Sequence, residues 1–260
     1  MKAIAKTELI DINTHLGRIR AFSTQREAAD WSSPYSGFNV CHYTADKPAH
    51  IAECRRRLAA ELNLAVENLI IPRQTHSANI AVVDSMPIDN AALENIDGIV
   101  TSQSDIALCI NTADCVPVIP VDPESGIIGA VHSGWRGTVE RISARAVEAM
   151  IRLGATPTNI IAAMGPSICP DCFEVGEEVA MKFRQEFGHT TVIPRTPRPH
   201  VDLPRAITLT LTDAGLQPAN IHLPPACSHC HPNTYFSARH QSPASGRTLT
   251  LILRTQTPMP

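Results

Sequence analysis

Aromatic residues are scarce in this chain, at 4% of 260 residues, and charged residues reach only 18%. Aliphatic side chains must therefore supply most of the buried surface, and an apolar fraction of 43% is enough to build a core. The formal net charge is only −3, so composition gives no electrostatic reason to expect nucleic acid or a membrane as a partner. A small anionic substrate is still allowed, because one local arginine can bind phosphate without changing the total.

The sequence also lacks long hydrophobic runs. No segment is apolar enough to span a bilayer, and the N-terminus has no apolar core of a secretory signal. We therefore expect a cytoplasmic protein. In that reducing compartment the eight cysteines are expected to be thiols, ligands or nucleophiles rather than disulfides, and most of them inert buried residues.

No internal repeat, low-complexity tract or linker divides the chain, so one continuous domain over residues 1–260 is the simplest prediction. The segment Thr196–His200, with two prolines, is the best candidate for an exposed loop. Strand-like apolar runs cover residues 68–71, 79–83, 98–101, 107–110, 116–121, 127–131, 160–164 and 248–253. Helical periodicity covers residues 50–63, 138–153, 176–187 and 202–214. Because the strands outnumber the helices and cluster, we predict an α+β fold with mixed sheets.

Three short polar segments stand where predicted strands give way to loops, which is where a scaffold presents side chains rigidly. They are Arg-Gln-Thr-His-Ser at residues 73–77, Asn-Thr-Ala-Asp-Cys-Val-Pro at 111–117 and Ala-Val-His-Ser-Gly-Trp-Arg-Gly at 130–137. Each contains one residue that binds zinc or copper well, namely His76, Cys115 and His132. Three protein ligands leave a coordination position open, which is the catalytic pattern. Spacing alone does not establish such a site, since eleven histidines and eight cysteines offer many combinations; a buried cysteine and two hydrogen-bonded histidines are the alternative.

These segments resemble the signature of the laccase-domain family, which is also described as YfiH-type purine nucleoside phosphorylases or polyphenol oxidases. The likeness rests on Gln-Thr-His, Ala-Asp-Cys and Val-His-Ser-Gly-Trp-Arg-Gly in this order, and it continues to Ser245-Gly246-Arg247. It implies a single domain of mixed sheets and flanking helices in α/β/β/α layers. One departure is Ala238-Arg239-His240, where the family usually has Tyr-Arg-Arg.

The resemblance also implies a function. His76, Cys115 and His132 match the metal-binding residues of the family, with zinc or copper as the metal. The associated reactions are phosphorolysis of adenosine, inosine and methylthioadenosine, deamination of adenosine, and copper-dependent oxidation of phenols. Purine nucleosides and phosphate are then the expected partners.

Further site residues follow from this chemistry. Deamination needs a metal-activated water at C6 of adenosine, in which Cys115 and His132 hold the metal, whereas phosphorolysis needs a bound phosphate. Arg136, between two glycines before a predicted helix, is expected to bind that phosphate, or else to be a surface arginine in a tight turn. Asp114 would orient a histidine, act as a base, or cap a turn. Arg73 and Gln74 would line the pocket or be solvated, and Asn39 is a further substrate-binding candidate.

Two C-x-x-C motifs lie far apart in the sequence, at Cys169 and Cys172 and at Cys227 and Cys230. The separation is much greater than in a compact zinc ribbon, so we do not expect the two motifs to share a metal. Cys227, His229, Cys230 and His231 could bind a metal by themselves, but we expect residues 227–231 to form a packed loop near the mouth of the active site.

Three other functions fit the same residues. Cys115 could be a nucleophile with His132 as its base, in a hydrolase of amides or esters. Copper in the same ligands could oxidise phenols. The chain could also be a binding module without catalysis, stabilised by its metal and unfolded by the removal of that metal.

Overall fold

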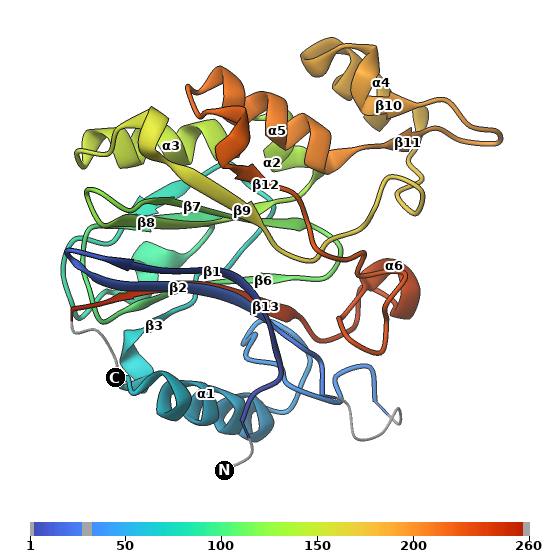
Figure 1. The fold of residues 1–260 in the computed structure, drawn as a ribbon. Coiled ribbons are helices and arrows are strands. Elements are labelled where there is room, and N and C mark those ends of the chain that lie inside the picture. Colours follow the sequence, from blue (N-terminus) through green and yellow to red (C-terminus); the bar gives the residue numbers. More distant parts are fainter. Residues whose placement is uncertain (1–2, 28–32, 257–260) are drawn as a thin grey trace.

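Two sheets stacked face to face form the centre of the structure, a computed structural model that describes residues 3–27 and 33–256 (Figure 1). The strands of the first sheet are, in spatial order, β1 (Lys6–Thr14), β2 (Gly17–Thr24), β13 (Thr248–Thr255), β6 (Ala107–Thr112) and β3 (Leu69–Ile70). The strands of the second are β12 (Ile221–His222), β9 (Ile161–Met164), β7 (Val116–Asp122), β8 (Ile127–Ser133), β5 (Gly98–Thr101) and β4 (Ile80–Val82). Each sheet combines antiparallel pairs with parallel edge pairs, so both are mixed.

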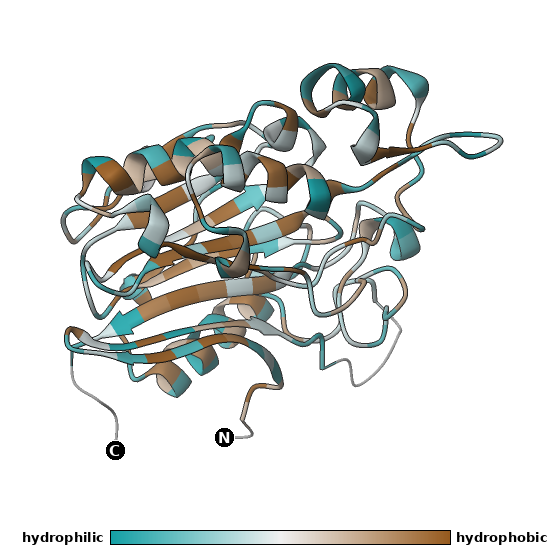
Figure 2. Ribbon diagram, turned by 45° about the horizontal axis from the view of Figure 1, so that its top comes forward, coloured by the Kyte–Doolittle hydropathy of each residue, from teal (hydrophilic) through white to brown (hydrophobic). Residues whose placement is uncertain are grey.

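Helices cover the outer face of each sheet (Figure 1). The helix α1 (Pro48–Leu62) packs on the first sheet, where Leu58 meets a cluster that includes Leu251 of β13. The helices α3 (Ile142–Arg152) and α5 (Leu203–Asp213) pack on the second sheet. The strands are largely hydrophobic (Figure 2), and Ile110 of β6 and Ile119 of β7 share the cluster between the sheets. The α/β/β/α layering confirms the predicted α+β fold with mixed sheets.

Further elements surround this frame. They are the helices α2 (Trp135–Val139), α4 (Glu177–Phe187) and α6 (Ala238–Gln241), the pair β10 (Val192–Ile193) and β11 (His200–Val201), and short 3-10 turns such as Pro157–Asn159 before β9. Within residues 3–27 and 33–256, no helix has the length and apolar character needed to cross a membrane.

All eight predicted strands are confirmed, although several ends shift by one or two residues. The helix predicted over residues 138–153 is instead two helices, because Arg141 adopts a left-handed conformation with φ of 56° and breaks the hydrogen-bond ladder. The strands β1 and β2 were not predicted, since β1 is mostly polar and half-exposed and lacks a clean alternation. The loop predicted at Thr196–His200 lies between β10 and β11, but His200 itself belongs to β11.

Candidate active site

The three predicted metal ligands come from three separate segments and meet at one point. His76 lies in the loop between β3 and β4, Cys115 in the turn between β6 and β7, and His132 near the end of β8. One ligand atom from each side chain lies within 4.8 Å of the other two. The Sγ atom of Cys115 is 3.9 Å from Nε2 of His76, and the two imidazole rings meet edge to face with centroids 4.8 Å apart.

A buried carboxylate, Asp97, fixes the positions of His76 and His132 through hydrogen bonds. Its Oδ1 accepts a hydrogen bond from Nδ1 of His132 at 2.7 Å and another from the backbone N–H of His76 at 3.0 Å. Its Oδ2 accepts from the backbone N–H groups of Thr75 and Ser77 and from the Ser77 hydroxyl. Since Nδ1 of His132 donates to Asp97, Nε2 is left as the metal-binding atom. The same carboxylate fixes the His76 loop, in which His76 has a left-handed φ of 64°.

The charges of these groups stabilise one another. Desolvation raises the pKa of the Cys115 thiol, but His132 and His76 outweigh it and lower that pKa to about 6. Desolvation likewise lowers the pKa of His132, but Cys115 and Asp97 raise it to about 9. Burial opposes ionisation of Asp97, yet hydrogen bonds from His132 and Ser77 hold its pKa well below the usual range. The thiolate, which is the form that binds a metal, is therefore favoured at neutral pH.

The space between the ligands depends on Gly134, which precedes α2. A Cβ atom at this position would lie 3.0 Å from Cδ2 of His76 and 3.1 Å from Sγ of Cys115. The φ of Gly134 is −76°, so the backbone does not require glycine, and the missing side chain leaves room beside the ligands. The group therefore offers two imidazoles and one thiolate, has room beside them, and has a carboxylate behind one imidazole. This set of donors fits a zinc or copper ion.

The three ligands open into a cavity of about 300 Å³, the lower end of the range for small-molecule sites. Its walls are formed by Tyr43, Gln74, His76, Asn111, Ala113, Cys115, His132, Ala238, Pro243 and Arg247. Ala238 is the position at which the family usually has tyrosine, so the cavity wall carries a smaller side chain here than that pattern predicts.

Gln74 and Asn111 form the polar part of this wall. The Gln74 amide donates to the Asn111 carbonyl and accepts from the Asn111 N–H and the Tyr43 hydroxyl, each at 2.8 Å. Both amide atoms of the Asn111 side chain are buried and have no hydrogen-bond partner among the described residues. The amide does lie near the Tyr43 phenol, whose pKa burial raises and Asn111 slightly lowers. Leaving a buried amide unpaired costs free energy, so a ligand that pairs with this amide would recover that cost.

Three predicted substrate-binding residues lie elsewhere. Arg73 lines a separate cavity and forms an exposed ion pair with Glu94 at 3.5 Å. Arg136 is exposed, and its guanidinium lies over the Trp135 ring, 4.3 Å from the centroid. Asn39 is fully buried and accepts a hydrogen bond from the backbone N–H of Arg247, so it supports the cavity wall rather than lining it. Substrate contacts by these three residues stay predictions that the geometry does not favour.

Of the roles predicted for Asp114, its hydrogen bonds fit capping better than the orientation of a histidine. Its carboxylate accepts hydrogen bonds from the Ser228 hydroxyl and the Arg239 N–H, both at 2.7 Å. The carboxylate that orients a histidine is therefore Asp97. Asp114 instead connects the Cys115 turn to Ser228 and to Arg239 of α6. A role for Asp114 as a general base stays a prediction.

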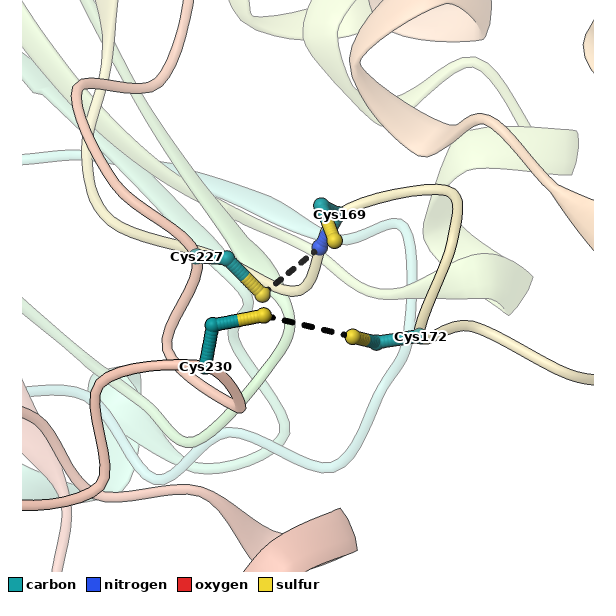
Figure 3. A group of neighbouring side chains, drawn as sticks. All are labelled: Cys169, Cys172, Cys227 and Cys230. Atoms are coloured by element: carbon teal, nitrogen blue, oxygen red, sulfur yellow. Dashed lines mark hydrogen bonds between the residues drawn. The ribbon is translucent and has the colours of Figure 1, made fainter.

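The two C-x-x-C motifs were not expected to share a metal, yet the structure places them side by side. One atom from each of the four cysteines lies within 4.8 Å of the others (Figure 3). Cys41, Cys54 and Cys109 are buried outside both groups, and the expectation that most cysteines are inert stays a prediction. The loop at residues 227–231 packs through Ser228, which is 2% exposed and donates a hydrogen bond to Asp114, the residue before Cys115.

Sequence reasoning missed Asp97, Tyr43, Asn111 and Arg247. Asp97 is the carboxylate directly before the predicted strand at residues 98–101, which is a usable signal. Asn111 opens the second polar segment, and Arg247 ends the Ser-Gly-Arg motif. Tyr43 offered no comparable signal, because no motif or predicted element includes it.

Comparisons with known proteins find similarity along most of the chain. The model of a family described as multi-copper polyphenol oxidoreductase laccase matches residues 20–255. The chain is 43% identical over 257 residues to "Adenosine deaminase RL5" from an unknown prokaryotic organism, covering 95% of this chain and 98% of that protein. It is 37% identical over 232 residues to a "Purine nucleoside phosphorylase" of Deinococcus radiodurans, covering 89% of this chain and 87% of that protein. The crystal structure of YlmD from Geobacillus stearothermophilus has a TM-score of 0.84 and 29% identity, covering 91% of this chain and 92% of that one.

Proposed function

Because the chain belongs to the multi-copper polyphenol oxidoreductase laccase family, we propose that it is a metal-dependent enzyme of purine nucleosides. The observation that carries the proposal is a three-ligand metal group at one end of a 300 Å³ cavity with an unpaired buried amide in its wall. Relatives named adenosine deaminase and purine nucleoside phosphorylase support the substrate class. The proposed reactions are deamination of adenosine and phosphorolysis of adenosine, inosine and methylthioadenosine.

The metal in this proposal is zinc, held by His76, Cys115 and His132. Bound zinc supplies a Lewis acid that makes water nucleophilic near neutral pH, and neither proposed reaction requires a change of oxidation state. His132 is held in the ligand tautomer by Asp97, and the Cys115 thiolate supplies one negative charge. Oxidation of phenols by copper in the same ligands is a secondary proposal, suggested by the family description alone.

Substrate recognition is assigned to the polar wall. The Asn111 side chain presents one donor and one acceptor, which complement the N7 acceptor and N6 amino donor of adenine. Gln74 is already paired with the Asn111 backbone and Tyr43, so it holds Asn111 in place. Phosphate would meet Arg247, which lines the cavity and whose guanidinium donates to the carbonyl groups of Gly246 and Pro243.

The first test is an assay of zinc-loaded protein with adenosine, with and without phosphate, followed by chromatography. We expect inosine whether or not phosphate is present, and adenine with ribose 1-phosphate only when it is present. A chelator should abolish both reactions, and added zinc should restore them. Metal-loaded protein that leaves every nucleoside unchanged would refute the substrate class. Activity that survives the chelator but not a thiol alkylator would instead establish a cysteine hydrolase built on Cys115 and His132.

Replacing Asn111 by alanine is expected to raise KM for adenosine by about 10- to 100-fold, because a paired buried amide contributes about 1–3 kcal/mol. Zinc content should stay unchanged, since Asn111 is outside the ligand group. Steady-state kinetics and metal analysis on the same preparation measure both. The matched control is Asn159→Ala, an exposed asparagine before β9. An Asn111→Ala protein with the KM of the parent would remove Asn111 from the recognition model.

A further inference from the structure

We propose that Cys169, Cys172, Cys227 and Cys230 bind a structural zinc ion at a second site, separate from the His-Cys-His group. All four Sγ atoms lie within 4.8 Å of one another and point toward a common centre (Figure 3). The Sγ atoms of Cys172 and Cys230 are 3.5 Å apart. In a tetrahedral zinc thiolate site, Zn–S bonds of about 2.3 Å place the sulfur atoms about 3.8 Å apart.

The fold builds this site from two segments that leave the second sheet together. The strands β9 and β12 are parallel neighbours, with Ala162 beside Ile221 and Ala163 beside His222. Their continuations stay paired, because the Ser167 N–H donates to the Ala226 carbonyl at 3.2 Å and the Ser228 N–H donates to the Ser167 carbonyl at 3.0 Å. Cys169 and Cys227, the first cysteines of the two motifs, lie within two residues of these paired positions. Backbone hydrogen bonds therefore bring the two motifs together.

A backbone N–H group also stabilises negative charge on one of the four sulfur atoms. The N–H of Cys169 donates to Sγ of Cys227 at 3.2 Å, an interaction that stabilises a thiolate. The N–H of Cys172 donates to the Cys169 carbonyl at 3.0 Å and closes the first C-x-x-C turn. Four thiolates leave no coordination position for water or substrate, which is the composition of a structural zinc site. A disulfide needs a sulfur separation of about 2.05 Å, well below that of Cys172 and Cys230.

This second site is connected to the catalytic one through Asp114. The N–H of Ile168, next to Cys169, donates to the Asp114 carbonyl at 2.9 Å. The hydroxyl of Ser228, next to Cys227, donates to the Asp114 carboxylate at 2.7 Å. Asp114 has a left-handed φ of 86° and directly precedes Cys115. We infer that zinc in the four-cysteine site holds the turn that presents Cys115; this last step rests on the proposed function, whereas the site itself does not.

The test is a count of zinc per chain by native mass spectrometry and elemental analysis. The parent is expected to carry two zinc ions, and Cys172→Ser/Cys230→Ser is expected to carry one. These two cysteines are the ones to replace because both are partly solvent-exposed. Cys115→Ala is expected to lose the other ion, and Cys54→Ala, a buried cysteine outside both groups, should keep two. The double variant should also melt at least about 5 °C lower.

Cobalt substitution keeps the proposal testable if the double variant does not fold. In the Cys115→Ala protein, cobalt is expected to give the intense thiolate-to-cobalt absorption of a tetrahedral four-sulfur site. Zinc content unchanged by the double substitution, iron in place of zinc, or a Cys172–Cys230 disulfide in protein purified with zinc present would each overturn the proposal. The count does not depend on turnover, so it stands or falls separately from the nucleoside reactions.

Discussion

Replacing His132 by alanine is expected to remove the metal from the His-Cys-His group and to reduce adenosine turnover at least about 1,000-fold, because metal-activated water would be lost. His132 is the most buried of the three ligands, at 4% exposed, and the only one whose ring is held by Asp97. Two remaining ligands, one of them exposed, would not retain zinc at ordinary concentrations. Metal analysis and initial rates on the same preparation measure the effect.

His132→Ala also leaves the Asp97 carboxylate buried without its strongest partner, so part of any loss could come from reduced stability. His76→Ala separates the two effects, since His76 is exposed and its hydrogen bond to Asp97 comes from the backbone N–H, which alanine keeps. It should lose metal and activity with little change in melting temperature. The control His222→Ala replaces an exposed histidine of β12 and should change neither. A His76→Ala protein that keeps its zinc and full turnover would contradict the three-ligand site.

The three residues proposed as metal ligands could be singled out from the sequence because each follows a predictable strand. The runs at residues 107–110 and 127–131 are continuous and apolar, so the polar residues that follow them stand out. Family resemblance then linked three residues that spacing alone could not connect. The α+β class with mixed sheets followed from the clustered strands, whereas the α/β/β/α layering was implied by the family resemblance.

The residues that were missed depend on contacts between distant parts of the chain. Asp97 is 35 residues from His132, and before the fold is known it is one acidic residue at the start of a strand. The four-cysteine group brings together two motifs whose facing cysteines are 58 residues apart in the sequence. Their meeting depends on the strand β12, which has only two residues and is too short to predict. For Arg136 the sequence left two alternatives open, and the structure favours the surface arginine, since its guanidinium is exposed and lies over the Trp135 ring.

Replacing Asp97 by alanine is expected to lower the free energy of unfolding by about 3–5 kcal/mol, the cost of leaving buried hydrogen-bonding partners of a charged group unpaired. The carboxylate is fully buried, and it accepts hydrogen bonds from the His132 ring and from three successive backbone N–H groups, those of Thr75, His76 and Ser77. Metal affinity should fall as well, by about 10- to 100-fold, because His132 loses the partner that fixes its tautomer. Chemical denaturation and competition with a zinc chelator measure the two effects.

Asp122→Ala is the matched control, because Asp122 is 1% exposed and likewise accepts backbone hydrogen bonds, from Glu124 and Thr156, but at the opposite end of β7 from Cys115. It should destabilise the protein without changing zinc affinity at the His-Cys-His group. Asp97→Asn adds a second comparison, since its amide oxygen can still accept from backbone N–H groups but carries no charge to hold His132. It should recover part of the stability and less of the metal affinity. Equal loss of affinity in Asp97→Ala and Asp122→Ala would mean that Asp97 acts only through stability.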